Sequence, residues 1–200
     1  MENSPMHPLI QLQHVNVKLI LQHPEEVELE PLIPVFHGWI QEQTAGELLL
    51  DIADYRHVPA GPGIVLIGHE GDYSVDNTDG RPGVRYNRKA ALDGGNEVCL
   101  MQAARAALTA CQRLETDPRL GGKLRFNGHE IEIFINDRLL APNSDATRET
   151  ADSGFRAFAK KLFRGSEYSM AYASDRRRLF GVTLKSTKQF STADLLAALD

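Results

Sequence analysis

Histidine exchanges protons readily near neutral pH, and the segment 54–89 holds two histidines among carboxylates and arginines. His57 and His69 are therefore candidate acid/base residues for catalysis, with Glu70 as a third candidate. The two histidines, Glu70 and Asp72 can approach a metal ion only if the turns of the chain bring them together. Their spacing does not require this, so we expect neither a metal site nor a cofactor.

Arginine is a common partner of small anions and acidic proteins, because its planar guanidinium matches the oxygens of a carboxylate or a phosphate. Four arginines belong to the segment 54–89, and three more follow one another in a predicted turn. Lys160 and Lys161, on the helix expected before that turn, add to its positive charge. The candidate ligand-binding residues are Arg56, Arg85, Arg88, Arg176, Arg177 and Arg178.

Charge is divided unevenly along the chain. Residues 1–54 contain nine acidic residues and one lysine, whereas residues 153–188 contain nine basic and two acidic residues. The two regions can meet between copies in a homo-oligomer, meet within one molecule, or both face solvent. The basic region can also receive an acidic partner or a small anion. The net charge of -5 argues against nucleic-acid binding and against adhesion to an anionic membrane.

The sequence contains no complete catalytic motif. Gly61-Pro62-Gly63 leads into a predicted strand, so it does not fit the strand-to-helix turn that binds dinucleotides. The longest apolar runs are far too short to cross a membrane. Cys99 and Cys111 fall in one predicted helix, roughly 18 Å apart, which is too far for a disulfide. Unpaired cysteines suit a reducing compartment, so we expect a cytoplasmic protein with no membrane contact.

Apolar periodicity predicts the elements that must position these residues. Helices are expected at 31–43, 96–115, within 145–164 and at 191–199. Strands are expected at 12–21, 48–53, 63–68 and 84–88, with a further one near 73–75. Hairpins are expected over 123–136 and 167–185. Asn127-Gly128 predicts a type I′ turn in the first hairpin, because both turn residues take a positive φ there.

The helix ends are predicted from capping residues. Asn96 is the expected N-cap of the second helix. Ser191 and Asp194 have the spacing of a capping box at the start of the last helix.

The predicted elements do not alternate strictly between strand and helix, which favours an α+β fold over a doubly wound sheet. We expect a mixed, mainly antiparallel sheet with about four helices packed on it. Residues 1–8 are expected to form a flexible tail and 9–200 a single domain, with a division into two lobes near 118–122 as an alternative.

The basic region and the lack of a catalytic motif favour a binding or regulatory protein that recognises an acidic partner or a small anionic ligand. Two alternatives stay open. One is an enzyme with a polar active site in the segment 54–89 that uses a histidine as acid/base. The other is a structural subunit of a homo-oligomer, which would need a large apolar interface rather than a polar pocket.

Overall fold

A computed structural model describes residues 10–43 and 46–200, so the tail expected at 1–8 lies outside the described residues. The chain forms an eight-stranded sheet in the order β2-β3-β4-β5-β1-β6-β8-β7. The strands are β1 (Val15–Leu21), β2 (Leu49–Tyr55), β3 (Gly63–Gly68), β4 (Gly71–Asp76), β5 (Gly83–Arg88), β6 (Phe126–Ile135), β7 (Tyr168–Tyr172) and β8 (Phe180–Ser186). β1 pairs with β5 on one side and with β6 on the other. The sheet therefore joins strands from before and after residues 118–122.

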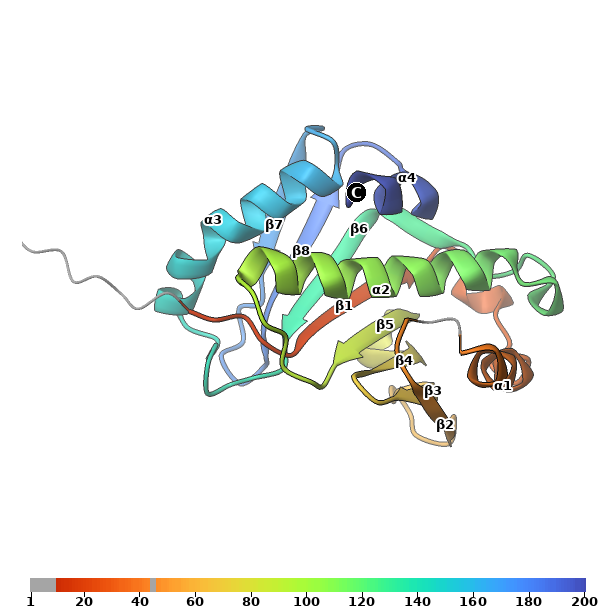
Figure 1. The fold of residues 1–200 in the computed structure, drawn as a ribbon. Coiled ribbons are helices and arrows are strands. Elements are labelled where there is room, and N and C mark those ends of the chain that lie inside the picture. Colours follow the sequence, from red (N-terminus) through yellow and green to blue (C-terminus); the bar gives the residue numbers. More distant parts are fainter. Residues whose placement is uncertain (1–9, 44–45) are drawn as a thin grey trace, which may run out of the picture.

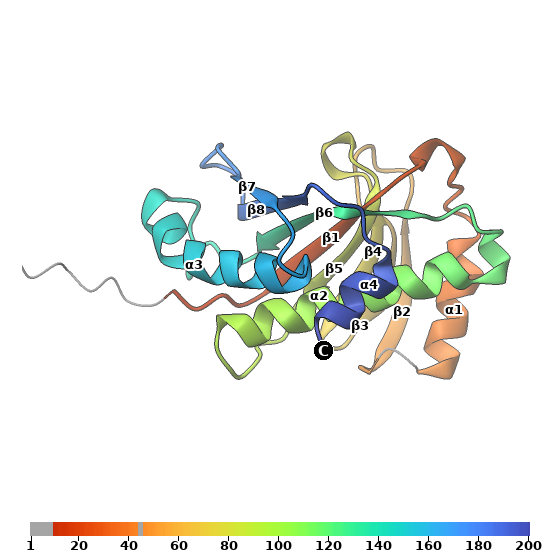
Figure 2. The ribbon, with the colours of Figure 1, turned by 90° about the horizontal axis from the view of Figure 1, so that it is seen from above.

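The helices of the described chain lie on one face of this sheet (Figures 1 and 2). They are α1 (Leu32–Glu42), α2 (Asn96–Thr116), α3 (Asp145–Leu162) and α4 (Thr192–Ala198), close to the predicted ranges. α2 packs on β1 and β5, whereas α1 packs on β2 and β3. The prediction of an α+β fold is confirmed. Within the described residues, no helix combines the length and the apolar character that a membrane span requires.

All neighbouring strands are antiparallel, so the prediction of a mixed sheet is wrong. β2 to β5 follow one another as a meander, and β7 and β8 form the hairpin predicted over 167–185. Successive strands joined by short turns must run antiparallel, because a parallel pair needs a crossover connection. The segment 54–89 is therefore mostly strand rather than loop.

β1 has two different faces, because side chains alternate along a strand. Val15, Val17 and Leu19 point toward the helices and are at most 1% exposed. Asn16 and Lys18 lie on the opposite face, which the α-helices leave uncovered, and yet are also buried, at 4% and 0% exposure. Since no described α-helix covers this face, neighbouring side chains and turns must bury them.

The hairpin predicted over 123–136 is wrong, because Phe126–Ile135 form one continuous strand. Gly128 lies inside this strand and does not take the positive φ of a type I′ turn. A Cβ atom added at Gly128 would overlap the carbonyl oxygen of Phe190. Glycine is needed here because another stretch of backbone comes close to the strand. Gly128 thus allows the backbone of Phe190 to pack closely against the strand and does not form a turn.

The helix ends agree with the capping prediction in one case and depart from it in the other. α4 begins with the capping box predicted at Ser191 and Asp194. Asn96 is the first residue of α2, and the residue before it takes the cap position, so the N-cap prediction is wrong. The Asn96 side chain accepts from the backbone N–H of Leu12 and donates to the carbonyl oxygen of Ile10. It therefore ties the start of α2 to the segment before β1.

Candidate functional site

The candidate acid/base histidines do not meet. His57 lies in the turn between β2 and β3, His69 lies in the turn between β3 and β4, and both are exposed. These turns are at opposite ends of β3, whose 6 residues span roughly 20 Å. Glu70 is held by Arg88, with 2.7 Å between Glu70 Oε2 and Arg88 Nη1. The two imidazoles therefore share no cleft, and the metal-ligand set that includes Asp72 is not assembled.

The six candidate ligand-binding arginines all have carboxylate partners within the described chain. Arg56, Arg88, Arg176 and Arg177 pair with Asp54, Glu70, Asp145 and Asp175, at N–O distances of 2.7 to 2.9 Å. They lie at separate places, in the β2–β3 turn, at the end of β5 and in the β7–β8 turn. Anion binding by these four residues stays a prediction, and only Arg85 and Arg178 reach a common cluster.

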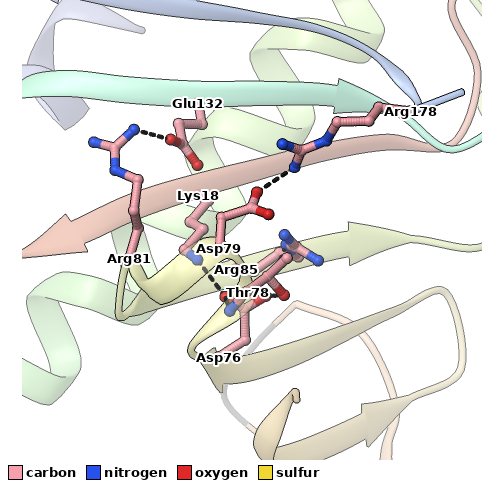
Figure 3. A network of polar contacts seen from close by, with 8 residues as sticks. All are labelled: Lys18, Asp76, Thr78, Asp79, Arg81, Arg85, Glu132 and Arg178. Atoms are coloured by element: carbon pink, nitrogen blue, oxygen red, sulfur yellow. Dashed lines mark hydrogen bonds and ion pairs between the residues drawn. The ribbon is translucent and has the colours of Figure 1, made fainter. Parts of the chain in front are cut away.

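This charged cluster lies at the centre of the helix-free face (Figure 3). Lys18 and Asp76 form an ion pair in which each side chain is only 1% exposed. Arg85 Nε lies 3.0 Å from the second oxygen of Asp76, although the groups are not aligned for a hydrogen bond. Arg81 pairs with Glu132, and Arg178 pairs with Asp79. The members of the charged cluster are Lys18, Asp76, Thr78, Asp79, Arg81, Arg85, Glu132 and Arg178.

Strand register explains how the charged cluster assembles. The Cα partners opposite Lys18 are Arg85 on β5 and Glu132 on β6. Asp76 ends β4, and the turn that follows brings Asp79 and Arg81 to the same place. Alternation along β1 predicts the face on which Lys18 lies, but it does not predict which charges lie beside Lys18.

Burial shifts the proton affinities of two groups in the charged cluster. It lowers the pKa of Lys18, and the ion pair with Asp76 opposes this change only in part. Burial also raises the pKa of Glu132, against the attraction of Arg81. Such shifts are frequent at catalytic sites. Here, however, Lys18 is closed to solvent and the cations of the cluster all face a carboxylate. The charged cluster therefore holds two turns against the sheet, and each of its cations lies beside a carboxylate, with Lys18 and Arg85 sharing Asp76.

A cavity that is open to solvent on one side, and that sequence analysis missed, lies on the helix side of the sheet. Its volume is about 190 Å³. Its wall consists of Trp39 from α1, Tyr73 from β4, and Gln102, Arg105, Ala106, Thr109, Ala110 and Arg113 from α2. Ala106 and Ala110 are four residues apart and so lie on one side of α2, where their small side chains leave room. This wall contains two arginines and no carboxylate.

Arg113 is a partly buried cation with an unused donor. Its guanidinium carbon lies 4.0 Å from the centre of the Trp39 ring. Its Nη2 is 3.2 Å from Glu42, whose side chain is 57% exposed, so this ion pair is weak. Its Nη1 is buried and has no hydrogen-bond partner among the described residues. Burial lowers the pKa of Arg113, but a guanidinium stays charged at physiological pH.

Gln102, another residue of the cavity wall, also has a buried polar atom without a hydrogen-bond partner in the described chain. Its Nε2 donates to the Tyr86 hydroxyl at 3.2 Å, while its Oε1 is buried and unpaired in the described chain. Arg105, by contrast, is occupied, because it donates to Asp200 and to the Leu199 carbonyl oxygen at 2.5 and 2.7 Å. Buried polar atoms without partners are rare and need an explanation. Two of them here belong to residues that line one cavity.

The sequence holds a faint signal for this cavity. Residues 102, 105, 106, 109, 110 and 113 recur with the period of a helix and are polar or small. A stripe of this kind is usually a solvated helix face. Only the approach of Trp39 and Tyr73, which are distant in sequence, turns it into a cavity wall.

No protein-family model matches this chain, and no curated protein is significantly similar to it. Its function is therefore inferred from the chemistry of the cavity and of the charged cluster.

Proposed function

We propose that this protein is a binding or regulatory protein that recognises a small anionic ligand in the cavity between α1 and α2. The observation that carries the proposal is the cavity wall, which combines two arginines with two aromatic rings and lacks a carboxylate. Arg113 attracts an anion, while Trp39 and Tyr73 pack against its apolar part. Ligand sites are commonly apolar hollows with a few polar groups that fix orientation.

The cavity supports anion binding better than the other basic places of the molecule. In the charged cluster, each cation already lies beside a carboxylate, and Lys18, at its centre, is closed to solvent. In the β7–β8 turn, Arg176 and Arg177 pair with neighbouring aspartates at 2.8 and 2.9 Å. Arg113 keeps an unused donor, and its partner Glu42 is exposed, so an incoming anion can replace Glu42 in a drier place.

The size of the cavity limits the ligand. Pockets for drug-sized ligands occupy about 300–1,000 Å³. A volume of about 190 Å³ is smaller, so it suits a compact ligand.

The proposal can be tested by NMR, because the chain has 1 tryptophan and it lines the cavity. The indole N–H of Trp39 gives one signal, which we expect benzoate to shift in a saturable way. Benzamide, which has nearly the same shape but no charge, should bind at least about tenfold more weakly, since a hydrogen bond to a charged group contributes about 1.5–3 kcal/mol.

The matched variants are Arg113→Gln and Arg177→Gln. The first removes the cation of the cavity and should weaken benzoate binding at least about tenfold. The second removes an exposed arginine whose side chain is 91% accessible, and it should bind benzoate as the unmodified protein does. The proposal fails if benzoate does not shift the Trp39 signal, or if both variants bind benzoate equally well.

A further inference from the structure

We infer that copies of this protein associate head to tail through two surfaces that lie apart from the cavity. One is the exposed apolar part of β2 and of the turn after it. The other is the turn between β6 and α3, together with the β7–β8 turn beside it. The inference rests on where exposed apolar side chains gather, on the charges that adjoin them and on the hydrogen bonds that hold the two turns.

The first surface lies on β2, an edge strand that pairs only with β3. Leu48 and Leu50 flank the buried Leu49, so the alternation of a strand turns them away from the core. They are 55% and 51% exposed, and Tyr55 and Val58 are exposed farther along the chain. We call these four exposed residues the β2 surface. An edge strand that exposes apolar side chains is suited to contact another chain.

The second surface lies in the turn between β6 and α3, where Leu139 and Leu140 are 90% and 41% exposed. Asp137 holds this turn, because its side chain accepts from the backbone N–H groups of both leucines at 3.0 and 2.9 Å. Asn143 ties it to the β7–β8 turn by donating to two backbone carbonyl oxygens there. We call the two leucines the turn surface. Apolar residues held in this way lose little conformational freedom on binding.

Charges of opposite sign adjoin the two surfaces. Asp51 follows Leu50 and forms no ion pair within the described residues, although its side chain accepts from the next backbone N–H. Arg138 precedes Leu139, and its one side-chain hydrogen bond in the described chain goes to the carbonyl oxygen of Arg177. Asp51 of one copy can therefore pair with Arg138 of the next while the apolar residues beside them pack together.

The positions of the two surfaces favour contact between copies in a head-to-tail arrangement. β2 and β6 are five strand spacings of about 4.8 Å apart, roughly 24 Å, so the surfaces do not meet within one molecule (Figure 1). Two β2 surfaces in contact would place Asp51 and Asp54 near like charges. Two turn surfaces would place Arg138 near like charges. Each contact therefore uses one surface of each kind, which leaves a free surface at both ends for further copies.

The test uses two variants that each block one surface, Leu50→Asp and Leu139→Asp. Either variant alone should weaken self-association at low salt at least about tenfold, because it buries a carboxylate in an apolar contact. An equimolar mixture should form a dimer and nothing larger, since each variant retains the surface that the other lacks. Val98→Asp is the matched control, because Val98 is 47% exposed and belongs to neither surface. It should associate as the unmodified protein does. Sedimentation velocity measures all four samples.

Exchange of the charges gives a second test. Asp51→Arg and Arg138→Asp should each weaken association, and the chain that carries both changes should associate again. The inference is overturned if the unmodified protein is monomeric at low salt, or if the mixture of Leu50→Asp and Leu139→Asp stays monomeric. It is also overturned if Leu139→Asp self-associates as the unmodified protein does, which would indicate a symmetric contact through β2 alone. None of these outcomes bears on benzoate binding, so the proposed function is tested separately.

Discussion

A buried lysine and a partly buried arginine of this protein have different surroundings and therefore different roles. Lys18 is closed to solvent and paired with Asp76, so its charge is used within the fold. Arg113 stacks on Trp39 and keeps one donor unpaired in the described chain. A buried charge needs partners, and one whose partners are incomplete can obtain them from a ligand. Residue type alone would have placed the anion site at the arginine-rich turn 176–178.

Two neighbouring glutamates on β6 respond to their surroundings in opposite ways. Burial raises the pKa of Glu132 above its ordinary value of 4.5. Burial also acts on Glu130, but hydrogen bonds from Arg81 and Lys185 outweigh it and hold the pKa of Glu130 below 4.5. A group with a raised folded-state pKa contributes stability at low pH that is lost as the pH rises through that value. A group with a lowered folded-state pKa contributes stability that is lost as the pH falls.

These opposite shifts predict opposite pH profiles for two variants. Relative to Glu132→Gln, the unmodified protein should lose stability as the pH rises above 4.5. Relative to Glu130→Gln, it should lose stability as the pH falls below 4.5. Urea unfolding measured from acidic to neutral pH gives both differences. Profiles of the same sign for the two variants would show that the described environments of these carboxylates are wrong.

Among the elements, helices and most strands follow from local patterns. α1, α2 and α3 lie close to their predicted ranges because apolar residues recur with the helical period over ten or more residues, whereas the 7-residue α4 was located by its capping box. The continuous β6 was missed, because Asn127-Gly128 is a strong local turn signal and the approach of Phe190 to Gly128 is a long-range contact. The pairing register of the strands was not predicted either, because it also depends on contacts between residues that are distant in sequence. The partners of Lys18 and the contact of Trp39 with α2 join residues that are distant in sequence.

The role assigned to Gly128 makes a prediction about this strand. Gly128→Ala would place a methyl group against the backbone of Phe190 and should destabilise the protein by about 1–3 kcal/mol or more. Gly154→Ala is the matched control, because Gly154 lies within α3 with nothing near its Cβ position. It should stabilise the protein by about 0.5–1 kcal/mol, since alanine favours a helix. Thermal unfolding measures both, and a neutral Gly128→Ala would contradict the close approach of Phe190 to this strand.

At the scale of the whole molecule, the described contacts do not pair the acidic region 1–54 with the basic region 153–188. Within 10–43 and 46–200, the carboxylates that pair with basic residues of 153–188 are Asp79, Glu130, Asp145, Asp152 and Asp175. None of these belongs to the acidic region 1–54. The described contacts therefore give no support to pairing of the two regions inside one molecule, and pairing between copies stays a prediction.

Pairing between copies predicts self-association that depends on salt. The screening length falls from about 30 Å at 0.01 M to about 3 Å at 1 M ionic strength. We therefore expect oligomers at low salt that dissociate at high salt, as measured by sedimentation velocity. A monomer under both conditions would contradict the homo-oligomer and leave both charged surfaces to solvent or to an acidic partner.

The central claim is that a small carboxylate binds between α1 and α2, and the most direct test is to locate bound benzoate. Intermolecular nuclear Overhauser effects report which protons lie beside the ring protons of the ligand. The structure predicts contacts with the Trp39 indole and with the methyl groups of Ala106 and Ala110, which line the cavity. Contacts confined to other parts of the surface, such as the β7–β8 turn, would contradict the claim.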